Sequence, residues 1–164
     1  MPRQPRWMLL AQDAAYHVMS RGHNREAIFA DSDDLRYFLA LLARYRERFG
    51  FRLYHYCILA NHFHLLLQPE DPRHLSRLMA GLLVAYARSL NRRHGFVGHL
   101  FQGRFKSPVV QREGYWLSCG RYIERNRSRR AYARHLGSTL GRAAGLTPWA
   151  RLTRWYRKTP ATQN

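Results

Sequence analysis

The sequence of 164 residues is short of cysteine, of long apolar runs and, in its second half, of acidic residues. Two cysteines, Cys57 and Cys119, are too few for a disulfide framework or a cysteine-rich zinc site, so we expect reduced thiols. No apolar run reaches membrane-spanning length. The basic N-terminus is followed only by the apolar run 7–11, which is too short for a signal-peptide core. These absences predict a cytoplasmic protein.

The scarcity of acidic residues is confined to one part of the chain. Residues 1–71 contain nine arginines and eight carboxylates, whereas residues 72–164 contain seventeen arginines and two lysines against only Glu113 and Glu124. The net charge of +18 therefore comes almost entirely from the second segment. A solvated basic face would explain a milder excess. An imbalance this one-sided favours a polyanionic partner, because arginine binds phosphate oxygens with a forked pair of hydrogen bonds.

The sequence nevertheless has the composition of a folded domain. Hydrophobic residues make up 46% and aromatic residues 13%, and the length suits one domain with one core. Many aromatic residues lie among the arginines of the second half, a mixture that suits the stacking of unpaired bases. We expect about half of these aromatic side chains to belong to the core instead. There is no internal repeat and no low-complexity tract.

Hydrophobic periodicity predicts an alternating order of strands and helices. The predicted strands are 14–19, 51–59, 61–68 and 104–111, and the predicted helices are 33–49, 75–91 and about 113–127. Asp31 to Asp34 supplies N-cap chemistry for the first helix, and Gly50 supplies its stop. The inner order β-α-β-β-α-β predicts an α+β fold of the ferredoxin-like type, with an antiparallel sheet and helices on one face. The other face is then available for a site.

A histidine pair lies in the third predicted strand. Side chains alternate between the faces of a strand, so His62 and His64 point one way while Phe63, Leu65 and Leu67 point the other. Two neutral imidazoles on one face can bind one metal ion. The alternative is a pair of ordinary histidines on a half-exposed strand.

The last predicted helix carries a second group of candidates. Tyr115, Tyr122 and Asn126 recur at helical spacing on one stripe, and Arg121 and Arg125 flank Tyr122. A tyrosine hydroxyl could attack a phosphodiester if cations stabilise the phenolate and a metal polarises the phosphate. An amide oxygen could join two histidines around Mg²⁺ or Mn²⁺ and leave positions open for phosphate oxygens. Taken alone, Tyr122 would be an ordinary core or surface tyrosine.

These motifs resemble those of the HUH endonucleases, and more closely those of the REP-associated tyrosine transposases, which are single-tyrosine relatives of insertion-sequence transposases. The resemblance covers roughly residues 5–135. Four ordered stretches carry it: 16–25 (Tyr-His-Val-Met-Ser-Arg-Gly-His-Asn-Arg), 61–67 (Asn-His-Phe-His-Leu-Leu-Leu), 91–107, and 121–126 (Arg-Tyr-Ile-Glu-Arg-Asn). Relatives usually continue Asn-Pro-Val-Arg-Ala after this tyrosine, whereas this chain reads Asn126-Arg127-Ser128-Arg129-Arg130-Ala131 and lacks the proline.

The resemblance implies roles for individual residues. His62, His64 and Asn126 would bind Mg²⁺ or Mn²⁺, and Tyr122 would be the nucleophile that forms a 5′-phosphotyrosine. Tyr115 is the competing nucleophile, and Glu124 is interpreted as structural. Residues 1–135 would form the transposase domain and 136–164 its basic C-terminal extension. The residues expected to bind DNA are Arg21, Arg92, Arg93, Arg104, Lys106, Arg121, Arg125, Arg127 and Arg129.

The expected function is therefore cleavage and rejoining of single-stranded or hairpin DNA, by a monomer or homodimer associated with the bacterial nucleoid. One alternative is a nucleic-acid-binding module without catalysis, either a regulator or an RNA-binding ferredoxin-like protein. The altered segment after Asn126 favours that alternative. A second alternative is a phosphodiesterase that uses water at the histidine–metal site, which would leave no protein–DNA adduct.

Overall fold

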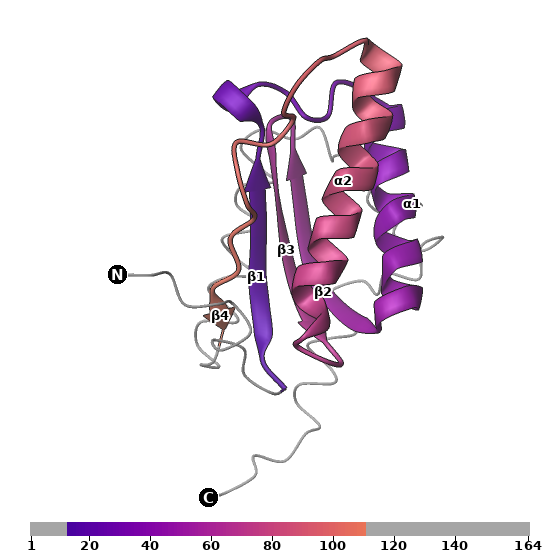
Figure 1. The fold of residues 1–164 in the computed structure, drawn as a ribbon. Coiled ribbons are helices and arrows are strands. Elements are labelled where there is room, and N and C mark those ends of the chain that lie inside the picture. Colours follow the sequence, from indigo (N-terminus) through magenta and orange to yellow (C-terminus); the bar gives the residue numbers. More distant parts are fainter. Residues whose placement is uncertain (1–12, 111–164) are drawn as a thin grey trace, which may run out of the picture.

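The computed structural model describes residues 13–110 as a four-stranded antiparallel sheet with two long helices (Figure 1). The sheet order is β2-β3-β1-β4. In chain order the elements are β1 (Ala15–Arg21), the 3-10 turn η2 (His23–Arg25), α1 (Ser32–Phe49), β2 (Phe51–Leu59), β3 (His62–Pro69), α2 (His74–His94) and β4 (Val109–Val110). This is the predicted ferredoxin-like α+β arrangement. The expected additional helix over 113–127 lies outside the described residues.

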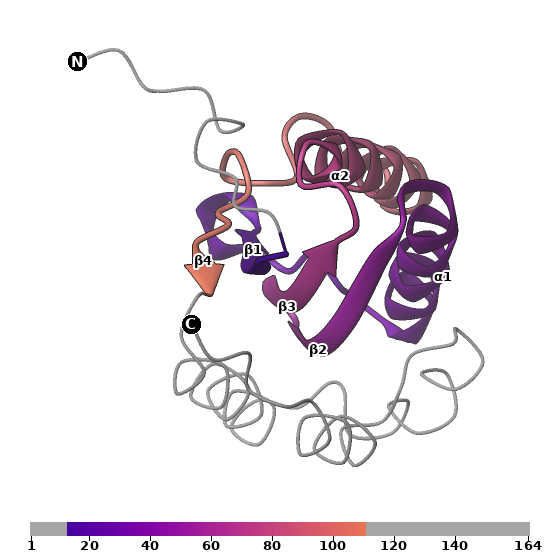
Figure 2. The ribbon, with the colours of Figure 1, turned by 90° about the horizontal axis from the view of Figure 1, so that it is seen from below.

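Both helices cover the same face of the sheet, as Figure 2 shows in a view along the strands. The main core lies between them and the sheet. Phe38 of α1, Tyr86 of α2 and Phe63 of β3 meet there with little or no exposed surface. Phe38 contacts Phe63 and Tyr86 with ring centroids about 5 Å apart, at 5.0 and 5.2 Å. The core thus fixes β3 in the middle of the sheet with one face sealed against the helices.

The ends of α1 follow from the residues that flank it. The Asp31 side chain accepts hydrogen bonds from the backbone N–H groups of Asp33 and Asp34, which satisfies donors that have no partner within the helix. Gly50 has a φ of 61°, a conformation that favours glycine, and its N–H donates to the carbonyl of Arg46. Both predicted boundaries of this helix are confirmed to within one residue.

The hairpin of β2 and β3 is also as predicted, with a tight turn at Ala60 and Asn61. Its pairing places Leu59 opposite His62 and Cys57 opposite His64. The register shifts between Leu53 and His55, which marks an irregularity in β2. On the other side of β3, strand β1 pairs over its length, so β3 is central and both of its edges are hydrogen-bonded.

Two predicted boundaries were wrong. The structure extends α2 to His94, three residues beyond the predicted end, and stops it at Gly95 with φ 69°. The predicted strand 104–111 is regular only at Val109–Val110. The segment before it still contacts β1, through an isolated bridge between Met19 and Lys106. Pro108 accepts a hydrogen bond from the N–H of His17, but as proline it cannot donate one in return, so the ladder is interrupted there.

Candidate active site

The pairing of β1 with β3 assembles a row of polar side chains on the sheet face opposite the helices. Arg21 lies opposite His62, Met19 opposite His64, and His17 opposite Leu66. Alternation then places Phe63, Leu65 and Leu67 in the core beneath the helices, where each is 0% exposed. The sequence pattern predicted this division of β3 into an apolar face and a histidine face, and the structure confirms it.

The two histidines of β3 lie side by side. The ring centroids of His62 and His64 are 5.1 Å apart, with the rings nearly perpendicular. His64 is only 5% exposed, and His62 is partly buried. Two further residues contact them: the Oδ1 atom of Asn61 lies 2.7 Å from Nδ1 of His62, and Nε2 of His17 lies 3.0 Å from Nδ1 of His64. Neither Asn61 nor His17 was assigned a role from the sequence.

Burial favours the neutral form of His64 and of His17. Burial first, and then the charges of His17, His62 and Arg21, lower the pKa of His64 to about 3. Burial also lowers the pKa of His17. A neutral imidazole keeps one nitrogen lone pair, which a metal ion requires. The donor set of His62 and His64 therefore fits a divalent cation that takes its remaining ligands from elsewhere.

A pocket of about 320 Å³ opens beside the histidines. Three cationic side chains, Arg21, Arg104 and Lys106, line it and are exposed. The remaining lining residues are Met19, Ser20, His62, His64, Gln102 and Gly103. Among the described residues 13–110 no carboxylate lines the pocket, so this lining attracts anions.

Backbone contacts hold the segment 101–106 against β1 and so build one wall of the pocket. The N–H of Gln102 donates to the carbonyl of Arg21 at 2.9 Å, and Lys106 and Met19 exchange two hydrogen bonds at 2.9 and 3.0 Å. The predicted DNA-binding residues Arg21, Arg104 and Lys106 are thereby brought together from distant parts of the chain. Sequence spacing alone could not show this, because the contact depends on how the loop crosses the sheet edge.

A second polar cluster lies where α1 begins and α2 ends. Asp31, Asp34 and His94 place their ligand atoms within 4.8 Å of one another, which is close enough to share a metal ion. Arg93 already occupies this cluster: its Nη1 atom lies 2.8 Å from Asp31 and 2.6 Å from Asp34. The Arg93 hydrogen bond is the main cause that lowers the pKa of Asp31 to about 2. The guanidinium thus supplies the positive charge that a metal would otherwise bring.

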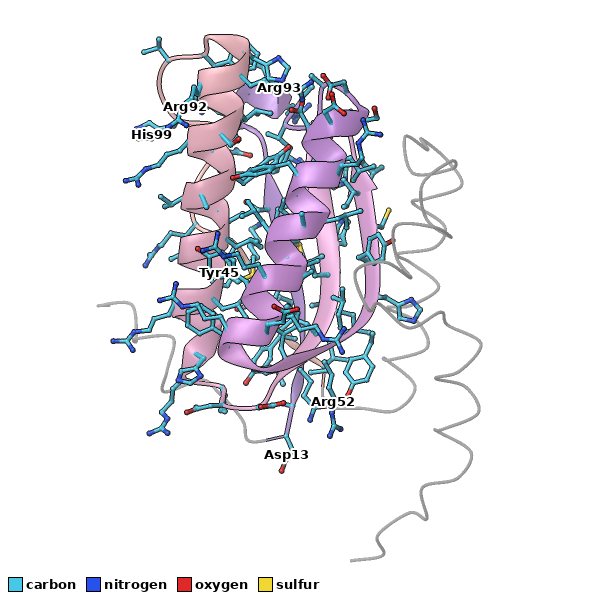
Figure 3. All side chains as sticks on the ribbon, turned by 90° about the vertical axis from the view of Figure 1, so that its right-hand side faces the viewer. Asp13, Tyr45, Arg52, Arg92, Arg93 and His99 are labelled. Carbon is cyan, nitrogen blue, oxygen red and sulfur yellow. The ribbon has the colours of Figure 1, made fainter. Side chains whose placement is uncertain are left out.

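Two of the predicted DNA-binding arginines lie at this end of α2 rather than in the pocket. Figure 3 shows Arg93 beside the start of α1, whereas Arg92 and His99 lie on the side of α2 away from α1. Arg92 is exposed. The guanidinium of Arg93 binds three aspartates, which include Asp33 at 3.2 Å. DNA binding by Arg92 and Arg93 stays a prediction.

The other predicted site residues lie outside the described residues 13–110. These are Tyr122, Asn126, Arg121, Arg125, Arg127 and Arg129, together with the competing Tyr115 and with Glu124. Their roles stay predictions, as do the domain boundaries 1–135 and 136–164. Neither helix in the described part of the chain is long and apolar enough to cross a membrane.

Comparison with known structures supports the fold. A REP-associated tyrosine transposase bound to a REP hairpin superposes with a TM-score of 0.59 at 14% identity, covering 91% of this chain and 90% of that one. A protein from Deinococcus radiodurans assigned as a transposase superposes with a TM-score of 0.50 at 19% identity, covering 76% of this chain and 97% of that one. A search of curated proteins finds no match.

The comparison of the sequence with protein families is more specific than the structural likeness. The family described as IS200-like transposases matches residues 11–126, which is most of the chain. That span contains the whole described sheet, both helices and the histidine pair. The chain therefore belongs to the IS200-like transposase family.

Proposed function

We propose that this transposase binds single-stranded or hairpin DNA, and cleaves and rejoins it by metal-assisted transesterification through Tyr122. The observation that carries the proposal is the pocket in which His62 and a buried, neutral His64 lie beside three cationic side chains. A similar structure, the REP-associated tyrosine transposase, was solved bound to a REP hairpin. Hairpin DNA is therefore the partner that we propose here.

Different residues of the pocket would bind the cation and the phosphate. His62 and His64 would hold Mg²⁺ or Mn²⁺, with Asn126 as a third ligand. The bound ion would polarise the scissile phosphate and stabilise its developing charge. Arg21, Arg104 and Lys106 would bind the phosphate oxygens and orient the strand.

Tyr122 would perform the covalent step. Its hydroxyl oxygen bonds to phosphorus, the bond from phosphorus to the 3′ oxygen breaks, and the proton lost by the phenol is balanced by the one gained at the 3′-hydroxyl. The products are a 5′-phosphotyrosine and a free 3′-hydroxyl. Because the phosphoester bond is preserved in the linkage, the reverse attack by a 3′-hydroxyl rejoins DNA without a nucleotide cofactor.

The basic residues outside the pocket would bind the rest of the DNA. We assign this role to the predicted residues Arg92, Arg93, Arg121, Arg125, Arg127 and Arg129. Binding through so many cations releases counterions, so affinity would fall steeply as salt rises. We place the protein in the cytoplasm at the nucleoid, as a monomer or a homodimer.

The test uses end-labelled hairpin DNA, the full-length protein, and Mg²⁺ or Mn²⁺. We expect a labelled protein–DNA band that survives denaturation, requires the metal and disappears in Tyr122→Phe while DNA binding remains. Tyr115→Phe is the matched control and should keep the band.

Three other outcomes would contradict parts of this proposal. A band that persists in Tyr122→Phe and is lost in Tyr115→Phe would make Tyr115 the nucleophile. Cut DNA without an adduct would indicate a phosphodiesterase that uses water. Binding with neither cutting nor adduct would indicate the non-catalytic module that the altered sequence after Asn126 favours.

A further inference from the structure

Each histidine of the pair has a hydrogen-bonded neighbour at the same ring atom, Nδ1. A neutral imidazole carries one proton and one lone pair, on different nitrogens, and only the lone pair can bind a metal ion. The partner of one nitrogen therefore decides whether the other can be a ligand. This makes the neighbours of His62 and His64 as important as the histidines.

The neighbour of His62 fixes its tautomer. The amide nitrogen of Asn61 donates to the backbone carbonyl of Arg25 at 2.9 Å, so the amide oxygen is the atom that faces Nδ1 of His62 at 2.7 Å. Turning the amide over would place its oxygen against the Arg25 carbonyl, with two acceptors facing each other. An oxygen acceptor requires an N–H on the histidine. In a neutral His62 the proton would therefore be on Nδ1, and Nε2 would keep the lone pair.

The loop after β1 holds Asn61 in this orientation. The N–H of Gly22 donates to the backbone carbonyl of Asn61 at 2.9 Å. The N–H of Glu26 closes the turn by donating to the backbone carbonyl of His23. A Cβ at position 22 would lie 2.3 Å from the Glu26 carbonyl oxygen, so the tight loop requires glycine there. Arg25, whose carbonyl receives the Asn61 amide, has a φ of 63°. The stretch 20–25 thus supports the histidine pair through Asn61.

The neighbour of His64 is another imidazole. Nε2 of His17 lies 3.0 Å from Nδ1 of His64, and both side chains are 5% exposed or less. His17 could in principle be a third metal ligand. However, among residues 13–110 the group of three with ligand atoms within 4.8 Å of one another is Asp31, Asp34 and His94, not the three histidines. His17 contacts His64 and is therefore better placed to orient it.

We propose that Asn61 and His17 are positioning residues that keep the protons of His62 and His64 on Nδ1, which would leave the Nε2 lone pair of each histidine available to a divalent cation. In this arrangement His64 donates and His17 accepts, and the proton of His17 is on its own Nδ1. The inference rests on the proposed function for the identity of the ligand. It adds that neighbouring residues set the tautomers of both metal-binding histidines before any cation binds.

The first measurement is made on metal-free, full-length protein labelled with ¹⁵N-histidine. Long-range nitrogen–proton NMR spectra distinguish which ring nitrogen carries the proton. We expect His62 and His64 both to be protonated on Nδ1, with peaks assigned from His62→Ala and His64→Ala. Wild-type protein with the proton of either histidine on Nε2 would overturn the proposal, and this outcome does not depend on any variant.

The variants then test the two neighbours. In His17→Phe the tautomer of His64 should become mixed while that of His62 stays fixed, and Asn61→Leu should have the opposite effect. His55→Phe is a matched control, because His55 also pairs with Leu66, on the other side of β3. It should change neither tautomer. An unchanged His64 in a folded His17→Phe protein would contradict the proposal.

A Mn²⁺ titration followed by electron paramagnetic resonance separates this inference from the proposed function. His17→Phe and Asn61→Leu should each weaken Mn²⁺ binding by about 10- to 100-fold, the usual effect of removing a residue that orients a metal ligand. His55→Phe should leave the affinity unchanged. If Mn²⁺ binding is indifferent even to His62→Ala and His64→Ala, the proposed metal site is wrong, whatever the tautomers are.

Discussion

Two polar clusters in this protein contain similar residue types but have different roles. At the helix ends, Asp31, Asp34 and His94 surround Arg93, whose guanidinium binds both carboxylates. On the sheet, His62 and His64 lie beside Arg21, Arg104 and Lys106 in a pocket that no carboxylate of residues 13–110 lines. The first cluster joins α1 to α2, whereas the second leaves its positive charge for a partner. A group with metal-ligating residue types is therefore judged by whether a cationic side chain already binds it.

The largest expected effect is on stability, at the aspartate cluster that binds Arg93. Asp34 is 3% exposed and accepts hydrogen bonds from the N–H of Ala30 and from Arg93. Asp34→Ala leaves these donors without their acceptor, so we expect a loss of about 3 kcal/mol in the free energy of unfolding. Urea denaturation measures it.

The control for that prediction is Asp33→Ala, which removes an exposed carboxylate from the same turn. We expect it to cost less than about 1 kcal/mol, because exposed ion pairs contribute little. Equal losses in the two variants would mean that the buried position of Asp34 is not what stabilises the helix junction.

The second prediction concerns how stability depends on pH at His55, beside the histidine pair, and at Asp31, in the aspartate cluster. Burial lowers the pKa of His55, on the strand next to the histidine pair, to about 4. Between pH 6.5 and 4 the unfolded chain binds a proton that the folded chain does not, so stability falls on acidification, by up to about 1.4 kcal/mol per pH unit for each such group. His55→Phe should reduce that slope by the contribution of one proton.

The aspartate cluster responds at lower pH. The pKa of Asp31 is lowered to about 2, mainly by the hydrogen bond from Arg93. Its stabilisation is complete above pH 3.8 and is lost as the pH falls from 3.8 to 2. Arg93→Gln should weaken this second decline and leave the first, while the backbone N–H groups of Asp33 and Asp34 still lower the pKa of Asp31. A single decline that responds equally to both variants would show that His55 and Asp31 do not titrate separately.

The smallest expected effect concerns DNA. Arg104 lines the pocket with an exposed guanidinium, whereas that of Arg93 is bound by aspartates. Arg104→Gln should lower the slope of log affinity against log salt by about one, the contribution of one phosphate contact. Arg93→Gln should change the slope less. Fluorescence anisotropy with a labelled hairpin measures both, and the reverse ranking would contradict the comparison.

The fold was largely predictable because local patterns decide it. Asp31 and Gly50 mark the ends of α1, and the alternation around His62 and His64 assigns the two faces of β3. The fourth strand was predicted too long, because the interruption at Pro108 depends on its pairing with His17 across the sheet. Local sequence does not contain that register.

The site was predictable only where neighbours in sequence are also neighbours in space. His62 and His64 satisfy this condition, and Asn61 could have been found beside them, since it precedes His62 directly. His17 could not, because only the pairing of β1 with β3 brings it to His64, forty-seven positions away. Likewise, the three aspartates that bind Arg93 lie at the N-cap and in the first turn of the other helix.

The central claim is that the divalent cation binds the histidine pair and not the aspartate cluster. The most direct measurement is a Mn²⁺ titration of three full-length proteins: wild type, His62→Ala/His64→Ala, and Asp31→Asn/His94→Gln. We predict one bound Mn²⁺ in the wild type and in the aspartate-cluster variant, and its loss in the histidine variant. Binding that survives in the histidine variant and disappears in the aspartate-cluster variant would contradict the account.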